Sequence, residues 1–262
     1  MERISKSWTE LHRRSSILAL TGLLHFLLIF VTGVLILLDA TTVLGLNAWV
    51  KPLKFMVSIT IYLWTVAWLI GHIEGRKWPV RVIAWGVSLA MVVETVCLFI
   101  QASRGTTSHY NTATAFDGAV FAMMGTMIAI DTVLMVGLLL LFLPRIQSLS
   151  VPYQWGIRLG ILVFLFGGYV GGQMITNMAH TVGAADGGPG LPFLNWSTQA
   201  GDLRIAHALG LHALQILPLV GFWLGSKQER PLRWMFSAAA IYVVVMAGAF
   251  LQAKAGSPIL AL

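Results

Sequence analysis

The sequence predicts an all-α fold: a polytopic transmembrane helix bundle with seven spans. Of the 262 residues, 57% are hydrophobic and only 10% are charged, whereas soluble domains carry about 25% charged residues. Seven mostly apolar runs each reach the roughly 20 residues that a helix needs to cross a bilayer. The single cysteine, Cys97, excludes a disulfide framework and a multi-cysteine metal site. The composition therefore excludes a soluble enzyme and a disordered chain. It also excludes a nucleic-acid-binding module, because the basic residues stand in short clusters between the spans.

The seven predicted spans belong to one integral membrane domain, residues 1–262. In chain order they cover residues 15–38, 52–72, 79–103, 115–143, 153–178, 203–225 and 232–253. The first follows a polar leader, MERISKSWTELHRR. Its roughly 24 apolar residues exceed the 7–15 of a signal peptide's apolar region, so we expect a retained helix. The remaining spans are separated by polar connections, two of which are long.

Basic residues set the predicted orientation, because cytoplasmic loops carry an excess of Lys and Arg. With the N-terminus inside, 12 basic residues face the cytoplasm and 5 face outward. The outer five are Lys51, Lys54, Arg104, Arg204 and Lys254. The sequence therefore predicts an N-in, C-out protein.

Two connections on the predicted outer side are longer and more polar than the others. RGTTSHYNTATAFDG (104–118) joins the third and fourth spans, and HTVGAADGGPGLPFLNWSTQAGDLR (180–204) joins the fifth and sixth. Long loops of compact proteins are often lids or binding loops. The second loop, with its Gly/Pro-rich middle, is as consistent with a plain connector as with a lid.

Ionisable residues within spans mark candidate functional sites, because burying them in lipid is costly. Glu94 lies deep in the third span, and Gln101 and Arg104 follow it on roughly the same helical face. Asp131, in the fourth span, lies nearer the cytoplasm. A buried carboxylate is neutral unless it is paired, so Glu94 needs either a proton or a cation.

Histidines gather in the predicted outer half of the bundle, where we expect a polar cavity. Gln173, Asn177 and His180 share one stripe at the end of the fifth span. In DLRIAHALGLHALQ, at the start of the sixth, His207 and His212 are five residues apart. This spacing is about 140° around a helix, so the two do not readily bind one ion. Asp202, which opens the segment, is also a typical helix N-cap.

The predicted site combines four kinds of residue. Catalytic candidates are Glu94, His109 and Asp117. Candidate ligands for a metal or haem are His25, His109, His180, His207 and His212, with His25 and His212 best matched in depth for haem. Candidates for holding an anion, or else for anchoring in lipid headgroups, are Lys51, Lys54, Arg104 and Arg204. Supporting polar residues are Gln101, Asn111, Gln173, Asn177, Asp202 and Gln215.

Three segments, NAWVKPLKF, SHYNTATAFDG and DLRIAHALGLHALQ, resemble segments of polytopic bacterial membrane proteins of unknown function. The resemblance covers most of the chain and implies a multi-pass location in the bacterial cytoplasmic (inner) membrane, but no activity. Asp117, His109, His207 and His212 also supply residue types used by the seven-helix zinc hydrolases of the ceramidase and progestin-receptor type. Their order and the five-residue histidine spacing depart from that pattern, so we do not assign the chain to that family.

Three classes of function remain open. The first is an outward-facing His/Asp-rich site that binds haem b or a divalent metal ion, for redox or hydrolytic chemistry on a small or lipid-soluble molecule. The second is a proton-coupled small-molecule or ion transporter, with a path through Glu94, Asp131, His25 and His212. The third is an assembly subunit of a larger membrane complex or oligomer. We favour the first class, because a transporter needs polar groups in the cytoplasmic half as well, and Asp131 is the only clear intramembrane candidate there.

Overall fold

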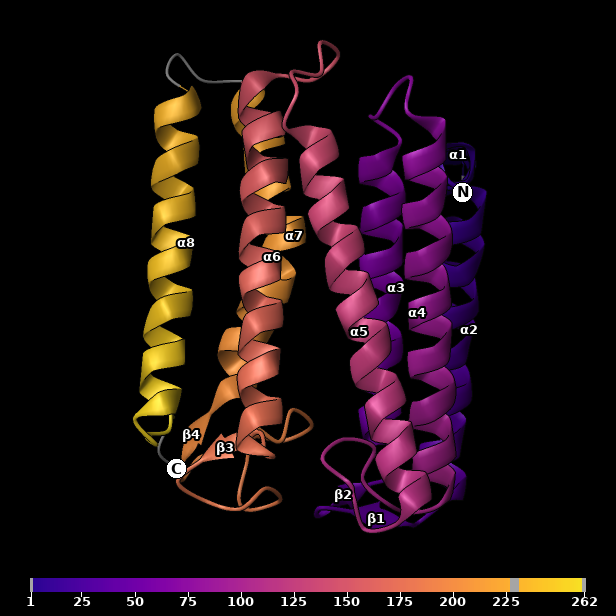
Figure 1. Ribbon diagram of the computed structural model, residues 1–262, viewed down its shortest axis with the longest axis vertical. Helices are drawn as coiled ribbons and strands as arrows, with labels where there is room; N and C mark the ends of the chain where they lie inside the picture. Colours follow the sequence, from indigo (N-terminus) through magenta and orange to yellow (C-terminus); the bar gives the residue numbers. More distant parts are fainter. Residues whose placement is uncertain (1, 227–230, 261–262) are drawn as a thin grey trace. The chain divides into compact units, whose positions relative to one another are not determined.

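In the computed structural model, the described residues, 2–226 and 231–260, form eight helices and two short two-stranded sheets (Figure 1). The helices are α1 Glu2–Arg14, α2 Ser16–Leu38, α3 Val50–Ile70, α4 Lys77–Ser103, α5 Ala115–Phe142, α6 Val151–Asn177, α7 Leu203–Gly225 and α8 Pro231–Lys254. The antiparallel strand pairs are β1 Thr42–Val43 with β2 Leu46–Asn47, and β3 Thr181–Val182 with β4 Gly201–Asp202.

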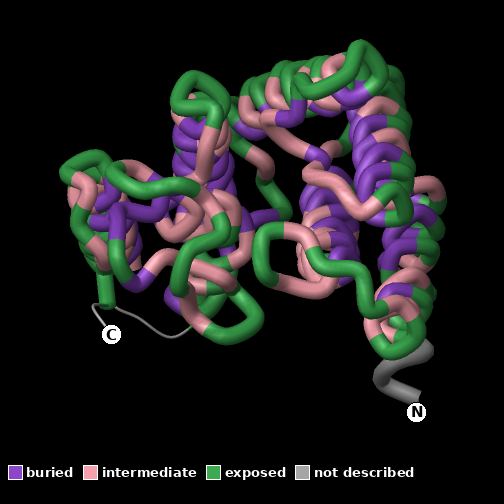
Figure 2. The backbone as a smooth tube through the Cα atoms, turned by 90° about the horizontal axis from the view of Figure 1, so that it is seen from below, coloured by how far each residue is buried: buried purple, intermediate pink, exposed green. Residues whose placement is uncertain are grey.

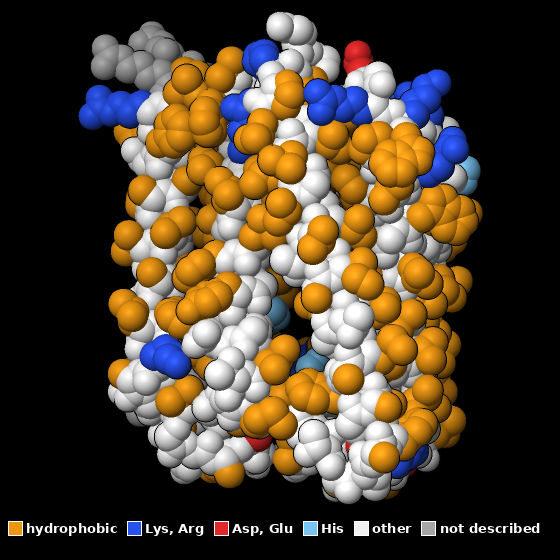
Figure 3. Space-filling model, in the orientation of Figure 1, with side chains coloured by type: hydrophobic (Ala, Val, Ile, Leu, Met, Phe, Trp, Pro, Cys, Tyr) orange, Lys and Arg blue, Asp and Glu red, His pale blue; other side chains and the backbone are white. Residues whose placement is uncertain are grey.

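Seven helices, α2 to α8, are long and apolar enough to cross a membrane, which confirms the predicted all-α, seven-span architecture. Each agrees with its predicted span to within two residues at either end. Large apolar side chains are exposed on these helices, among them Leu37, Val133 and Leu219, and hydrophobic side chains follow the helices along the face shown in Figure 3. Such a surface is costly in water but not in lipid. The protein is therefore a multi-pass membrane protein.

The chain divides into two compact units, Met1–Leu138 (unit 1) and Leu139–Leu262 (unit 2). Unit 1 holds α1 to α4 and most of α5, whereas unit 2 holds the end of α5 and α6 to α8. Along the helices of each unit, buried stretches alternate with exposed ones (Figure 2). The expectation of one integral membrane domain stays a prediction.

In unit 1, α2 packs on α3 and α4, and α1 contacts α2 and α3. The predicted polar leader is thus a helix, whose residue Leu11 is buried. Ser15 separates it from α2, where the Ser15 side chain accepts a hydrogen bond from the amide of Leu18. The turn between β1 and β2 places Leu44 and Gly45 at positive φ, as two-residue hairpin turns favour.

Arg14, the last residue of α1, connects this helix to the end of α3 through its side-chain contacts. Its guanidinium donates hydrogen bonds to the Trp68 carbonyl oxygen (2.7 Å) and to Glu10 Oε1 (2.8 Å), and Nη1 lies 3.2 Å from His72 Nε2. The guanidinium also stacks 3.9 Å from the centre of the Trp68 ring. Burial, and after it the charge of Arg14, lower the pKa of His72 to about 4, against the opposing effect of Glu10.

We expect Arg14→Ala to lower the unfolding temperature, because it removes a cation–π contact and leaves a carbonyl of α3 without its donor. Acid should weaken the same region in the wild type. Since the pKa of His72 is lowered, its neutral form contributes stability, which is lost as the pH falls from about 6.5 towards 4. Thermal unfolding across this pH range checks both effects. Arg13→Ala is the control, because the Arg13 side chain is 72% exposed; equal losses in the two variants would contradict the assigned role of Arg14.

In unit 2, α6 and α7 pack closely because glycines line their contact. A Cβ added at Gly210 of α7 would collide with the backbone of Gly167 of α6, and one added at Gly156 would lie 2.5 Å from the Leu217 carbonyl oxygen. Small residues at such positions let two helix backbones approach each other. This contact fixes the positions of the polar residues at the β3–β4 end of the unit.

Candidate functional site

Asp117 is the centre of a polar network at the β1–β2 end of unit 1. Its Oδ1 accepts hydrogen bonds from Gln101 Nε2 (2.8 Å) and Arg104 Nη1 (2.5 Å), and its Oδ2 accepts one from Thr114 Oγ1 (2.6 Å). Arg104 Nη1 also donates to Gln101 Oε1 (2.6 Å), which confirms that these two residues share a helical face. The network joins the end of α4 to the start of α5. Both carboxylate oxygens of Asp117 thus accept hydrogen bonds from neighbouring side chains, and a catalytic role of Asp117 stays a prediction.

His109 lies in the α4–α5 loop and faces α3. Its Nδ1 is 3.3 Å from Lys51 Nζ and 3.0 Å from Ser108 Oγ. Aromatic rings lie around it, with centroids 6.0, 5.9 and 6.3 Å away, from Phe55, Tyr110 and Phe121. Because an ammonium group can only donate, Nδ1 accepts and the neutral imidazole carries its proton on Nε2. A cation at this distance opposes metal binding at Nδ1.

Glu94 lies in α4 nine residues before its end at Ser103, roughly 14 Å along the helix. The side chain is 2% exposed, and Oε1 accepts no hydrogen bond from any described residue. The charged groups that act on it are Lys51 of α3 and Asp131 of α5. A carboxylate oxygen without a donor is strongly disfavoured in apolar surroundings. Glu94 therefore requires a proton, a cation or a ligand.

Asp131 extends the polar residues of unit 1 beyond Glu94. It is 4% exposed, and the Tyr62 hydroxyl lies 2.8 and 3.0 Å from its two carboxylate oxygens. A Cβ added at Gly86 of α4 would lie 2.5 Å from Leu134 Cδ1 of α5, which sets the register of these antiparallel helices. Asp131 is then level with position 89, roughly 8 Å along α4 from Glu94. The two carboxyl groups thus belong to neighbouring levels of α4 and α5, and not to the same level.

His25, a predicted metal or haem ligand, is fully buried in unit 1. Its Nδ1 lies 2.7 Å from the Thr21 carbonyl oxygen, and its Nε2 lies 2.8 Å from Thr95 Oγ1. Both ring nitrogens therefore have partners within the unit. An iron atom would have to displace one of them.

His180 follows α6 and belongs to unit 2. The helix ends before it because Met178 adopts a left-handed conformation, with φ of 52°, so the predicted stripe from Gln173 to His180 is interrupted. His180 Nδ1 lies 2.5 Å from Asp186 Oδ2, which also accepts the His180 amide, and Oδ1 accepts the amide and hydroxyl of Thr181. Burial raises the pKa of Asp186, but the hydrogen bonds from His180 and Thr181 outweigh it and hold that pKa well below its usual range.

Asp186 is a residue that the sequence analysis missed. It lies in the run GAADGG, outside any span, so neither depth nor helical spacing marked it. The signal present was a typical turn sequence, because Asp beside Gly favours tight turns that fold a carboxylate back onto nearby amides.

His207 lies on α7 against the glycines of α6. Its Nδ1 is 2.8 Å from the Gly167 carbonyl oxygen, and a Cβ added at Gly171 would lie 3.1 Å from its Cε1. His180 is the ionisable group that acts on it electrostatically. Only small residues in α6 leave room for this imidazole.

Asp202 caps α7, as the sequence predicts: its Oδ1 accepts the Arg204 amide (3.0 Å). The carboxylate also pairs with the Arg204 guanidinium, at 2.9 Å from Nε and 2.6 Å from Nη2. Arg204 and Arg104 thus each have an aspartate partner. Anion binding by these two arginines would compete with those ion pairs and stays a prediction.

The other predicted residues are spread over the two units. Asn111 donates hydrogen bonds within its own loop, to Thr106 Oγ1 (3.0 Å) and the Thr107 carbonyl oxygen (3.1 Å). Asn177 donates to the Thr181 carbonyl oxygen (2.7 Å). His212 is exposed, whereas half-buried positions are held by Lys54, Gln173 and Gln215. Of the predicted haem pair, His25 belongs to unit 1 and His212 to unit 2, and haem binding stays a prediction. Residues 2–226 and 231–260 contain no group of three or more His, Cys, Asp or Glu placed to hold a metal ion.

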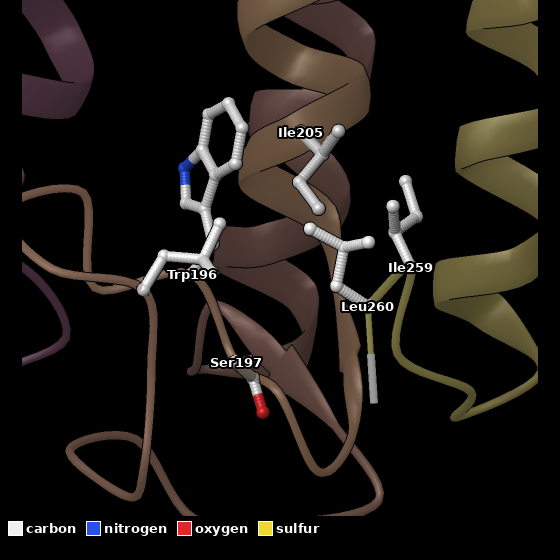
Figure 4. A pocket seen from close by; sticks show the side chains of 6 residues that line it. Trp196, Ser197, Ile205, Ile259 and Leu260 are labelled. Atoms are coloured by element: carbon white, nitrogen blue, oxygen red, sulfur yellow. The ribbon is translucent and has the colours of Figure 1, made fainter. Parts of the chain in front are cut away.

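A small apolar pocket of about 80 Å³ lies at the β3–β4 end of unit 2 (Figure 4). Its lining comes from the α6–α7 loop, the first turn of α7 and the segment after α8, and consists of Leu191, Trp196, Ser197, Ile205, Ile259 and Leu260. None of these six described residues has an ionisable side chain. The pocket suits an apolar group and offers no acid or base.

No protein-family model, curated protein or solved structure matches the chain.

Proposed function

We propose that the protein is a proton-coupled transporter of a small molecule or ion, and that Glu94 is the group that binds the proton. The observation that carries this proposal is the setting of Glu94. It lies well inside a membrane-spanning helix, is 2% exposed, and has a carboxylate oxygen that accepts no hydrogen bond from the described residues. Ionisable groups at such depth are expensive and typically belong to ion or proton pathways.

Polar groups on both sides of Glu94 support a path rather than a one-sided site. Lys51 acts on Glu94 from the β1–β2 end, and Asp131 with Tyr62 lies on the other side. The buried Ser88 Oγ, which has no hydrogen-bond partner among the described residues, is one residue from the level of Asp131. Water that bridges the gap would find polar partners there. A binding site open to one side only would not need the Asp131–Tyr62 pair.

We propose the N-in, C-out orientation, in the bacterial cytoplasmic membrane. Seven crossings place the N-terminus and the α3–α4, α5–α6 and α7–α8 connections on one side. That side holds 12 of the 17 basic residues, which favours the cytoplasm. The β1–β2 turn and the α4–α5 and α6–α7 loops then lie outside, with His109, Asp117 and His180.

The test is proton movement in sealed proteoliposomes that contain a pH-sensitive dye. With a mixture of Na⁺, amino acids and sugars supplied outside as test substrates, an imposed membrane potential should drive protons inward through the wild-type protein and not through Glu94→Gln. Equal rates in the two samples would contradict the proposal.

The contacts of His180 and His207 in unit 2 favour a second candidate function, the binding of a metal ion or haem for redox or hydrolytic chemistry. His180 Nδ1 lies 2.5 Å from Asp186, and His207 Nδ1 lies 2.8 Å from the Gly167 carbonyl oxygen. Each neutral ring that donates from Nδ1 carries its lone pair on Nε2. Histidines that ligate metals typically donate their other nitrogen to a carboxylate or a backbone carbonyl in this way.

Elemental analysis and an absorption spectrum of the detergent-purified protein test the second candidate. We expect bound metal or a haem band in the wild type. Asp186→Asn should weaken metal affinity about 10- to 100-fold, because the carboxylate orients His180. Asp39→Asn is the control and should not weaken it, because, among the described residues, this carboxylate of unit 1 accepts hydrogen bonds from Thr41 and Trp49 and not from a histidine. Wild-type protein without metal and without a haem band would contradict this candidate.

A further inference from the structure

Exposed cations gather at the α1 end of unit 1, near the top of the purple helices in Figure 1. Arg76 precedes α4, and Lys77 and Arg81 lie in its first two turns, one helical turn apart. All three side chains are exposed. Among the described residues no hydrogen bond or ion pair joins these side chains to a partner. Glu74, also exposed, is the acidic residue of the same connection. The three residues, here the basic cluster, thus carry a local excess of positive charge.

Tryptophans place the basic cluster at the membrane boundary. Trp78 follows Lys77 and is 76% exposed, Trp85 lies two turns further along α4 and is 59% exposed, and Trp68 near the end of α3 is 40% exposed. Exposed tryptophans on spanning helices collect at the level of the lipid headgroups. The cations beside Trp78 are therefore at the depth of lipid phosphates.

We propose that Arg76, Lys77 and Arg81 bind the phosphate groups of anionic phospholipids in the adjacent leaflet. Charge complementarity argues for this occupant, since three cations are opposed by one carboxylate in the connection. Guanidinium groups pair with phosphate oxygens through two parallel hydrogen bonds. Basic residues at a membrane surface each strengthen attraction to anionic lipid by about fivefold. The proposal uses the spanning helices alone and does not depend on proton coupling at Glu94.

The test compares binding of a fluorescent short-chain phosphatidylglycerol and of its phosphatidylcholine counterpart to the full-length protein in detergent. The wild type should prefer phosphatidylglycerol, and added salt should reduce the preference. The double variant Lys77→Gln/Arg81→Gln should lose roughly 25-fold of it, from about fivefold for each charge. The matched control Arg233→Gln/Lys254→Gln removes two exposed charges from unit 2 and should retain it.

Several outcomes would overturn the lipid site. These are equal binding of the two lipids by the wild type, an undiminished preference in Lys77→Gln/Arg81→Gln, or an equal loss in the control. Displacement of the lipid by inorganic phosphate at the same concentration would also overturn it, because the cluster would then be a site for soluble anions. Unfolding temperatures of the variants establish that they are folded, which their exposed positions lead us to expect.

Discussion

Glu94→Gln is expected to abolish proton movement through the protein while leaving it folded. Glutamine has nearly the shape of glutamic acid, so the packing around this buried position is kept, but it cannot bind and release a proton. Oε1 accepts no hydrogen bond from the described residues, so the substitution breaks none at that atom. We therefore expect an unfolding temperature equal to or above that of the wild type.

Three further variants make this result specific. Glu74→Gln removes an exposed carboxyl of the same unit and should transport as the wild type does. Glu94→Asp keeps an acid but withdraws it by one methylene, so partial activity is expected. Asp131→Asn should slow transport, because Asp131 and Tyr62 lie beyond Glu94 on the proposed path. Wild-type rates in Glu94→Gln, or losses in Glu74→Gln as large as those in Glu94→Gln, would refute the role of Glu94.

Chemical labelling tests the same residue without knowledge of the transported substrate. A lipid-soluble carbodiimide reacts with a protonated carboxyl group in an apolar setting, and the adduct is found by peptide mass spectrometry. We expect an adduct on Glu94 that is absent from Glu94→Gln, and transport that falls as labelling rises. Labelling confined to exposed carboxyls such as Glu74 would show that Glu94 is ionised or out of reach.

The sequence predicts the spanning helices well because one physical property defines them. A run of about 20 apolar residues is required whatever the neighbouring helices are, and all seven predicted spans agree with helices α2 to α8. Helix α1 was not predicted, because its many polar residues led us to treat residues 1–14 only as a polar segment before the first span. Its fixed position comes from Arg14 and a buried Leu11, contacts that depend on residues of α3 and its end.

The side-chain pairs of the candidate site could be predicted only where both partners share a helix or a turn. Gln101 with Arg104, and Asp202 with the start of α7, follow from local spacing. Two other contacts connect segments that are far apart in the sequence: Lys51 lies beside His109, and Tyr62 lies beside Asp131. Their meeting depends on how each helix is rotated about its axis. In lipid the inward and outward faces are both apolar, so the sequence carries little amphipathic signal for that rotation.

Gly210→Ala is expected to destabilise unit 2 strongly. The added methyl group would collide with the backbone of Gly167 and would lie 2.7 Å from Met246 Cε. Methionine can move aside, but a helix backbone cannot, so α6 and α7 must separate. Overpacking of this kind costs about 1–3 kcal/mol or more. Thermal unfolding of the purified protein in detergent measures the loss.

Gly172→Ala is the matched control, since the same added methyl group meets nothing within 4 Å. Alanine is favoured over glycine in a helix by about 1 kcal/mol, so this variant should be as stable as the wild type or more stable. Equal stability of Gly210→Ala and Gly172→Ala would contradict the close approach of α6 and α7. The substitution should also weaken the hydrogen bond of His207, because the carbonyl group that its Nδ1 contacts belongs to Gly167. If unit 2 binds a metal or haem, Gly210→Ala should therefore lose it under conditions in which Gly172→Ala retains it.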